Sequence, residues 1–257
     1  MALVDAELRD NVAVIRLNDP ARMNALSDAL VEGLVSALSA AAGDPAVRCI
    51  VITGTGNAFC AGGDLDVIVM SDPNMVRDYL RRMQAWAASL GAIEKPLIGA
   101  VNGAAVGAGL SLALLADIVV ASRQARFQAA FPRLGAVPDL GLAYTLPRAV
   151  GHPVANDLLL TNRTLTAEEA LALGLVSRVF DADSFDRSVL EIAGQLAKGP
   201  TRALGLTKRL LAQGMTGSLH SLLEIEAATQ ALAFATDDFS AGVAAFKERR
   251  QPRFTGA

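Results

Sequence analysis

The stretch from residue 97 to residue 117 constrains the fold of this chain more than any other. It begins with LIGAV (97–101), an apolar run of β-prone residues, and reaches GAG (107–109) just before an apolar run suited to a buried helix. A strand that leads through a glycine turn into a helix leaves backbone N–H groups unpaired and pointing one way, with the helix dipole behind them. We therefore expect a turn here that can hold an anion.

A second turn of the same kind lies earlier in the chain. The segment NAFCAGGD (57–64) follows a predicted strand over 47–53. Two turns that each offer one N–H to a common point would form an oxyanion hole, where a carbonyl oxygen can carry negative charge. The plainer alternative is that glycine follows each strand only because the backbone must bend there.

The composition favours a soluble protein with a large core. Of the 257 residues, 52% are hydrophobic and 19% are charged, which is typical of a folded chain, and the net charge of −3 gives no reason to expect nucleic-acid binding. The N-terminal residues lack the features of a secretion signal, and no apolar run approaches the ~20 residues that span a bilayer. We expect a cytoplasmic protein with no membrane partner, whose Cys49 and Cys60 are buried thiols.

Strand, turn and helix recur along the first part of the chain, which predicts a layered α/β fold. We expect a hairpin around residues 10–11, a helix capped by Ser27, and a helix over 73–91 with a core-facing stripe that begins at Met75. From residue 138 onward helices with short breaks dominate, one of them starting with a capping box at 166–169. No low-complexity linker separates the two parts, so we expect one domain over 1–257.

Three segments, in this order and at this spacing, carry a family likeness. AFCAGGDL, GAVNGAAVGAGLSLALLADI and LGAVPDLGLAYTLPRAVG closely resemble the enoyl-CoA hydratase/isomerase family, also called the crotonase family, and the likeness runs from about Val12 to Phe254. The resemblance implies an α/β crotonase-like spiral of β-β-α units over about 1–195. It also implies a C-terminal α-helical trimerisation region over about 196–257, and hence a homotrimer or a dimer of trimers.

The resemblance assigns the two turns a chemical role. A thioester carbonyl becomes an enolate when a proton leaves the adjacent carbon, and N–H groups aimed at the carbonyl oxygen stabilise the charge that collects there. By the family pattern, the donors are the backbone N–H groups of Gly63 and Ala108. Many members carry glycine at the second position, but the methyl group of Ala108 need not abolish a backbone contribution.

The residues that accompany the oxyanion hole favour isomerisation over hydration. Hydratases of the family use two glutamates, and the matching positions here are Ser111 and, approximately, Phe131, neither of which is a carboxylate. Asp139 matches the acidic residue that isomerases of the family place beside the thioester. One carboxylate can take a proton from one carbon and return it to another, and apolar neighbours would raise its pKa. The alternative is that Asp139 only caps a helix starting at Leu140.

Coenzyme A would be part of the substrate, and no separate cofactor is implied. The resemblance implies a groove that binds the pantetheine and adenine of coenzyme A. It also implies that two residues of the last helix region of an adjoining subunit contact the same coenzyme A. The groove residues are Arg22, Ala25, Ala61, Asp64 and Leu65, and the contacts from the adjoining subunit are Phe246 and Arg249. The alternative is that the basic residues near the end of the last helix are solvent-exposed and only interact favourably with the helix dipole.

Other polar residues fit catalysis less well. Asp64 is also a candidate helix cap, and the side chain of Asp117 is expected to make structural hydrogen bonds. His152 and His220 have no nucleophile motif nearby, and no cluster has metal-ligand spacing. We therefore expect an acyl-CoA isomerase that acts on a 3-enoyl-CoA or a ring-type thioester. The alternatives are an enoyl-CoA hydratase with non-standard acid/base residues and a catalytically silent acyl-CoA binding protein.

Overall fold

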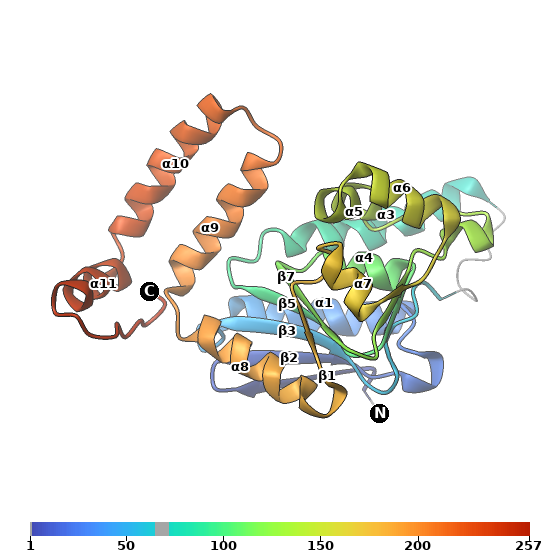
Figure 1. The fold of residues 1–257 in the computed structure, drawn as a ribbon, viewed down its shortest axis with the longest axis horizontal. Helices are drawn as coiled ribbons and strands as arrows, with labels where there is room; N and C mark the ends of the chain where they lie inside the picture. Colours follow the sequence, from blue (N-terminus) through green and yellow to red (C-terminus); the bar gives the residue numbers. More distant parts are fainter. Residues whose placement is uncertain (1, 65–71) are drawn as a thin grey trace.

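The computed structural model describes residues 2–64 and 72–257, and its centre is a six-stranded sheet (Figure 1). The strand order is β1-β2-β3-β5-β7-β10, with β1 antiparallel to β2 and all other neighbours parallel. The strands are β1 (Val4–Arg9), β2 (Val12–Leu17), β3 (Cys49–Gly54), β5 (Leu97–Val101), β7 (Ile118–Ser122) and β10 (Arg178–Phe180).

A second sheet of short strands contacts the first and has the order β4-β6-β8-β9. Its first three strands are parallel, and β9 is antiparallel to β8. The strands are β4 (Ala58–Cys60), β6 (Ala104–Val106), β8 (Arg126–Gln128) and β9 (Leu165–Thr166). The chain therefore passes from the large sheet to the small one three times, at β3 to β4, β5 to β6 and β7 to β8.

Helices follow the strand pairs β1–β2, β3–β4, β5–β6 and β7–β8, and more helices come after them. They are α1 (Asp28–Gly43), α3 (Pro73–Leu90), α4 (Ala108–Leu114), α5 (Leu142–Val150), α6 (His152–Thr161), α7 (Ala167–Ala172) and α8 (Phe185–Ala197), with the 3-10 turns η1 (Pro20–Arg22), η2 (Phe131–Leu134) and η3 (Ala182–Ser184). The order of strand, strand and helix confirms the predicted α/β fold of β-β-α units.

The large sheet is covered on both faces. The side chains of Val14, Val51 and Ile98 pack with Phe185 and Val189 of α8 in one buried cluster. Alternate positions of the same strands belong to the larger cluster that α1 and α4 complete. Because parallel strands with two covered faces are apolar along their whole length, these strands appear in the sequence as continuous hydrophobic runs.

Local sequence signals correctly predict several turns and helix starts. Asp10 and Asn11 both have positive φ, at 46° and 67°, as a tight hairpin between β1 and β2 requires. The side chain of Ser27 caps α1 by accepting a hydrogen bond from the N–H of Leu30. The capping box at 166–169 is also present, at the start of α7.

The prediction that the core-facing stripe of α3 begins at Met75 is wrong. Met75 is 59% exposed, and within this helix burial begins at Tyr79. The later members of the stripe, Met83, Trp86 and Leu90, are buried as predicted. The apolar period therefore gives the correct face of the helix but not the turn at which that face meets the core.

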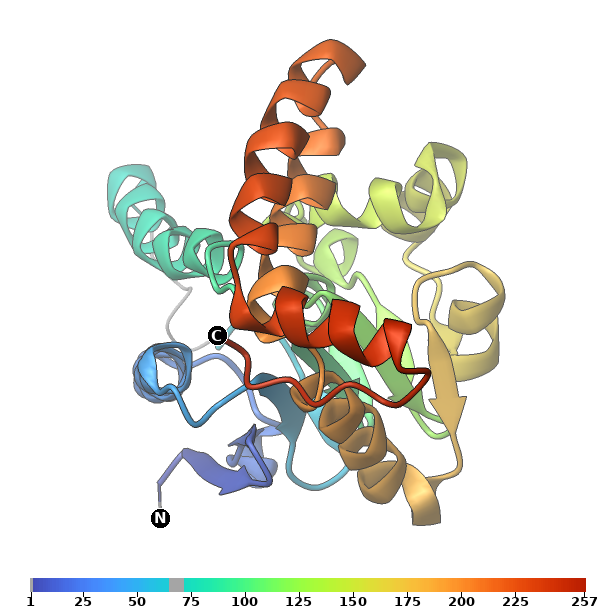
Figure 2. The same cartoon turned by 90° about the vertical axis from the view of Figure 1, so that its left-hand side faces the viewer.

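The last three helices form an arm that extends away from the sheets (Figures 1 and 2). The arm consists of α9 (Thr201–Gly214), α10 (Leu219–Phe234) and α11 (Asp237–Lys247). Arg48 holds its base, because the guanidinium donates to the carbonyls of Gly199 and Phe254 and to the hydroxyl of Thr201. Lys208 of α9 pairs with Asp117 at 2.6 Å. No described helix is long and apolar enough to cross a membrane.

Candidate active site

The two glycine turns leave neighbouring parallel strands at the same edge of the small sheet. β4 pairs with β6 so that Cys60 lies opposite Ala105. Gly63 and Ala108 each lie three positions beyond these paired residues, at the carboxyl ends of the two strands. The topology therefore brings the two residues predicted to be oxyanion donors into the same region.

The close approach of the two turns depends on glycine. Gly62 has φ of 102°, and a Cβ there would lie 2.8 Å from the carbonyl oxygen of Val106 and 3.4 Å from the nitrogen of Ala108. A Cβ on Gly109 would overlap the carbonyl oxygen of Cys60. The two backbones touch at these positions, with no room for a side chain between them.

Ala108 opens α4, so its N–H has no acceptor within the helix. The residue before it, Gly107, has φ of 53° and donates its N–H to the carbonyl of Gln128 at 3.0 Å, which fixes the turn onto β8. On the other turn, the N–H of Leu26 donates to the carbonyl of Gly62 at 2.7 Å. Each turn is thus held by backbone hydrogen bonds that do not use the N–H of Ala108.

Asp139 lies in the loop between η2 and α5. Its Oδ1 is buried and has no hydrogen-bond partner among the described residues. Burial disfavours the charged form and raises the pKa of this carboxyl from 3.8 to about 6. The interpretation of Asp139 as a helix cap is wrong, because Leu140 adopts φ of 43° and the helix begins at Leu142 after Gly141, with no side-chain cap.

The two positions where hydratases carry glutamate are both buried here. Ser111 is completely buried in α4, and its hydroxyl donates to the backbone carbonyl of Asp139 at 3.1 Å. Phe131 is 7% exposed and belongs to the main core cluster. Through the hydrogen bond from Ser111, the loop that carries Asp139 is tied to α4, the helix that begins at Ala108.

Tyr79 of α3 is a neighbour of this site that the sequence pattern identified only as a core residue. Burial raises the pKa of its phenol, and the negative charges of Asp28, Asp64 and Asp139 add to the effect. Tyr79 is 5% exposed, so its ring is packed in the core. The charges of Asp64 and Asp139, the two carboxylates of the candidate site, both act on its hydroxyl. No spacing rule in the sequence points to this proximity, because Tyr79 falls on the apolar period of the helix.

Most of the predicted coenzyme A groove comes together around η1. Arg22 forms an ion pair with Asp64 at 2.7 Å, and Asp64 is 4% exposed. The N–H of Ala61 donates to the carbonyl of Met23 at 3.0 Å, in the same short segment as Ala25. Leu65 lies outside the described residues, as would the helix that Asp64 was expected to cap.

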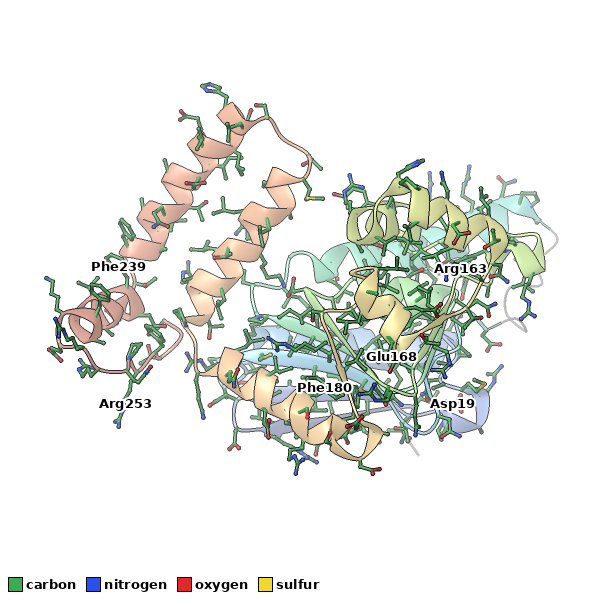
Figure 3. The ribbon with its side chains drawn as sticks, in the orientation of Figure 1. Asp19, Arg163, Glu168, Phe180, Phe239 and Arg253 are labelled. Carbon is green, nitrogen blue, oxygen red and sulfur yellow. The ribbon has the colours of Figure 1, made fainter. Side chains whose placement is uncertain are left out.

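The last two predicted contacts lie elsewhere in the chain. Phe246, at the end of α11, is 86% exposed, and Arg249 follows that helix with φ of 53°. Both lie at or just after the end of α11, on the side of the molecule where Phe239 and Arg253 are labelled, away from α4 (Figures 1 and 3). Within one chain they do not reach the glycine turns, and the expectation assigned them to an adjoining subunit.

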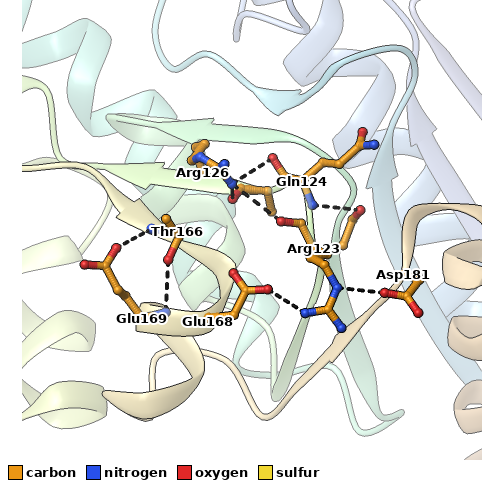
Figure 4. A network of polar contacts seen from close by, with 9 residues as sticks. Arg123, Gln124, Arg126, Thr166, Glu168, Glu169 and Asp181 are labelled. Carbon is orange, nitrogen blue, oxygen red and sulfur yellow. Dashed lines mark hydrogen bonds and ion pairs between the residues drawn. The ribbon is translucent and has the colours of Figure 1, made fainter.

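Two other sets of residues, the cysteines and an ion-pair network around Arg123, have structural explanations. Cys49 and Cys60 are free buried thiols, and burial raises the pKa of each to about 12. Arg123 pairs with Glu168 and Asp181, each at 2.7 Å, in an exposed network that joins α7 and the end of β10 to the turn after β7 (Figure 4). Among the described residues, no group of His, Cys, Asp and Glu is placed to hold a metal ion.

Comparisons with known proteins point to one family along nearly the whole chain. A model of the family described as enoyl-CoA hydratase/isomerase matches residues 7–257. The chain is 36% identical to 1,2-epoxyphenylacetyl-CoA isomerase of Escherichia coli K12, over 100% of this chain and 99% of that protein. It is 40% identical to 2,3-dehydroadipyl-CoA hydratase of the same organism, over 96% of each. A crystal structure of an enoyl-CoA hydratase/isomerase from Mycobacterium abscessus superimposes with a TM-score of 0.93 at 39% identity, covering 99% of this chain and 100% of that one.

Proposed function

The chain belongs to the enoyl-CoA hydratase/isomerase family, and from this premise we propose that it is an acyl-CoA isomerase that works through a thioester enolate. The observation that carries the proposal is the carboxyl of Asp139, which has a buried, unpartnered oxygen and a pKa of about 6. The positions of the two hydratase glutamates are occupied by Ser111 and Phe131, which cannot move a proton as a carboxylate does.

For a 3-enoyl-CoA the reaction consists of two proton transfers by one carboxylate. Ionised Asp139 takes a proton from the carbon next to the thioester, and the electron pair of that C–H bond moves toward the carbonyl oxygen. The N–H groups of Gly63 and Ala108 donate to this oxygen, and one such donor is typically worth roughly 3–4 kcal/mol. Protonated Asp139 then gives the proton to a different carbon, so the double bond moves and no water is added.

The raised pKa of Asp139 suits both halves of this cycle. A pKa of about 6 leaves the carboxyl mostly ionised at neutral pH, ready to act as a base. It also makes the carboxylate a stronger base than an ordinary aspartate, so that the two protonation states are closer in free energy during turnover. The absence of a described hydrogen-bond partner at Oδ1 supports its use for proton transfer.

The substrate would be a 3-enoyl-CoA or a ring-type thioester such as an epoxidised phenylacetyl-CoA. The Escherichia coli relative named 1,2-epoxyphenylacetyl-CoA isomerase supports the second class. Coenzyme A belongs to the substrate in either case, which would place the enzyme in acyl-CoA or fatty acid metabolism. Its pantetheine and adenine would lie along the segment that carries Arg22, Ala25, Ala61 and Asp64, with Leu65 as a further predicted contact.

We propose that the enzyme assembles as a homotrimer or a dimer of trimers through its helical arm. In the described chain α10 has no buried residue, although ten of its sixteen residues are apolar. Its large exposed apolar side chains are Leu219, Leu223, Ile225, Leu232 and Phe234. Such an uncovered helix supports contact with another copy, which would bring Phe246 and Arg249 to a neighbouring coenzyme A.

A second candidate is an enoyl-CoA hydratase in which other residues replace the glutamates. The 40% identity to 2,3-dehydroadipyl-CoA hydratase favours it. A third is a catalytically silent acyl-CoA binding protein, for which the absence of carboxylates at Ser111 and Phe131 is the argument.

A panel of thioesters assayed on wild type, Asp139→Asn and Asp139→Ala separates these candidates. Double-bond migration, hydration and ring opening are followed individually. We expect isomerisation in the wild type and a fall of about 10²- to 10⁴-fold in both variants, as for loss of a general acid/base. Equal rates for all three proteins would remove Asp139 from the mechanism. Hydration of crotonyl-CoA that survives in Asp139→Asn would favour the hydratase, and tight calorimetric binding without turnover would favour the binding protein.

A further inference from the structure

The backbone around Asp139 is held in a conformation that its own sequence does not favour. Leu140, the next residue, has φ of 43°, in the left-handed region that bulky side chains rarely adopt. Its side chain is 4% exposed and belongs to the main core cluster. A strained residue of this kind persists only where surrounding contacts hold it in place.

Two hydrogen bonds meet at the carbonyl oxygen of Asp139. The N–H of Leu142 donates at 2.9 Å from within the same turn, and the hydroxyl of Ser111 donates at 3.1 Å from α4. The Ser111 hydroxyl also lies 3.4 Å from the carbonyl of Gly107, but the contact with Asp139 is the shorter one. Among the described side chains, Ser111 is thus the one that ties the backbone of Asp139 to a different element.

The element that Ser111 belongs to also carries the predicted oxyanion donor. Ala108 is the first residue of α4, and the N–H of Ser111 donates to the carbonyl of Gly107 at 3.1 Å, so the two residues lie within one helical turn. Six of the seven residues of this helix, all except Leu114, are buried, which fixes it within the core.

We propose that Ser111 is a positioning residue that fixes the Asp139 carboxyl relative to the backbone N–H of Ala108. This inference rests on the proposed function, in which both groups act on one thioester. Ser111 itself is completely buried, and its hydroxyl bonds among the described residues only to backbone carbonyls, so it acts through Asp139 and not on the substrate. Where hydratases of the family have a glutamate, this chain has a hydroxyl that holds the loop bearing its own acidic residue.

Kinetics of Ser111→Ala test the proposal on the panel thioester that the wild type isomerises. Loss of the hydrogen bond should lower kcat by roughly 10- to 100-fold, because small misplacements of a reacting group cost this much. KM should change by less than about twofold, since binding contacts remain. Ser111→Thr keeps the hydroxyl and should restore most of kcat. Ser111→Cys fills the same space with a weak donor and should resemble Ser111→Ala even if the alanine variant folds poorly.

A matched control and a second readout distinguish positioning from a general structural role. Ser122 is also a buried serine with a backbone hydrogen bond, and it lies outside the site, so Ser122→Ala should keep the wild-type kcat. Exchange of the α-protons of hexanoyl-CoA with deuterium from solvent reports the first proton transfer alone. It should fall in Ser111→Ala and Ser111→Cys to the same extent as kcat. NMR titration of the Asp139 carboxyl should move toward the ordinary aspartate range as water reaches the loosened loop.

Failure of this inference and failure of the proposed function give different results. If Asp139→Asn keeps full activity, the proposed function fails. If Asp139→Asn is inactive while Ser111→Ala and Ser111→Cys both keep the wild-type kcat, exchange rate and carboxyl titration, only the role of Ser111 is overturned.

Discussion

At the scale of single residues, the properties of Asp139 come from its surroundings. The sequence identified the carboxyl and its apolar neighbours, and burial does raise its pKa. The sequence could not show that Leu140 takes a left-handed conformation, which delays the start of α5 to Leu142 and so removes the capping role. Backbone conformations of this kind are imposed by tertiary contacts and leave no local signal when the residue is not glycine.

The pKa of Asp139 predicts how the stability of the protein depends on pH. The folded-state pKa of about 6 lies above the ordinary value of 3.8, so between these values the folded chain binds the proton more tightly than the unfolded chain. This contribution to stability is therefore fully present below about pH 4 and is lost as the pH rises through 6. Asp139→Asn, which carries no charge, should be more stable than wild type at pH 8 by about 1–2 kcal/mol, a value reduced for the partial solvent exposure of the carboxyl.

Urea unfolding of wild type and Asp139→Asn at pH 5 and pH 8 checks this expectation. The stability difference should be larger at pH 8, and the variant that loses activity should be the more stable protein. If wild type and Asp139→Asn have the same free energy of unfolding at pH 5 and also at pH 8, the folded protein does not disfavour the ionised carboxyl.

At the scale of elements, the site depends on how closely two glycine turns approach. The sequence indicated both turns, yet it gave no sign of the pairing between β4 and β6 that brings them together. Strands of three residues are too short for a periodic pattern to identify. Some helix starts and turns were predictable because neighbouring residues determine them. Examples are the cap of α1 by Ser27, the hairpin at residues 10–11 and the capping box at 166–169.

Gly109→Ala tests whether this approach is required. A Cβ there would overlap the carbonyl of Cys60, so the turn and α4 would have to separate. We expect a loss of about 1–3 kcal/mol in the free energy of unfolding and a marked fall in kcat. Gly194→Ala in α8 is the matched control, because a Cβ there meets nothing within 4 Å, and it should be neutral or stabilising by about 0.5–1 kcal/mol. Wild-type stability and activity in Gly109→Ala would contradict the steric argument.

At the scale of the whole molecule, the arm is firmly attached at its base and uncovered beyond it. Arg48 and Lys208 connect the base to the sheets, whereas α10 has no buried residue. A cavity of about 510 Å³ between α9, α10 and α11 is lined by aromatic residues that include Phe234, Phe239 and Phe246. One chain therefore leaves an apolar surface exposed on the arm.

The double variant Leu223→Asp/Leu232→Asp tests the proposed assembly through α10. Both leucines are at least half exposed, so the variant should fold, with a circular dichroism spectrum like that of wild type. Charges on this helix should shift the protein to a smaller species in analytical ultracentrifugation and raise KM for the acyl-CoA, because Phe246 and Arg249 would no longer reach a neighbouring site. Leu8→Asp, at an equally exposed leucine of β1, is the control that should leave the assembly unchanged. An unchanged sedimentation coefficient in the double variant would contradict a role for α10.

The uncovered α10 also bears on how the protein is recovered from denaturant. Within the described chain α10 packs against the other arm helices and has no buried residue, so the proposed assembly would make the last stage of renaturation a bimolecular association, whose rate rises with protein concentration. Yield after dilution from urea should then pass through an optimum. At very low protein concentration association is slow, and at high concentration the exposed apolar side chains of α10 promote aggregation.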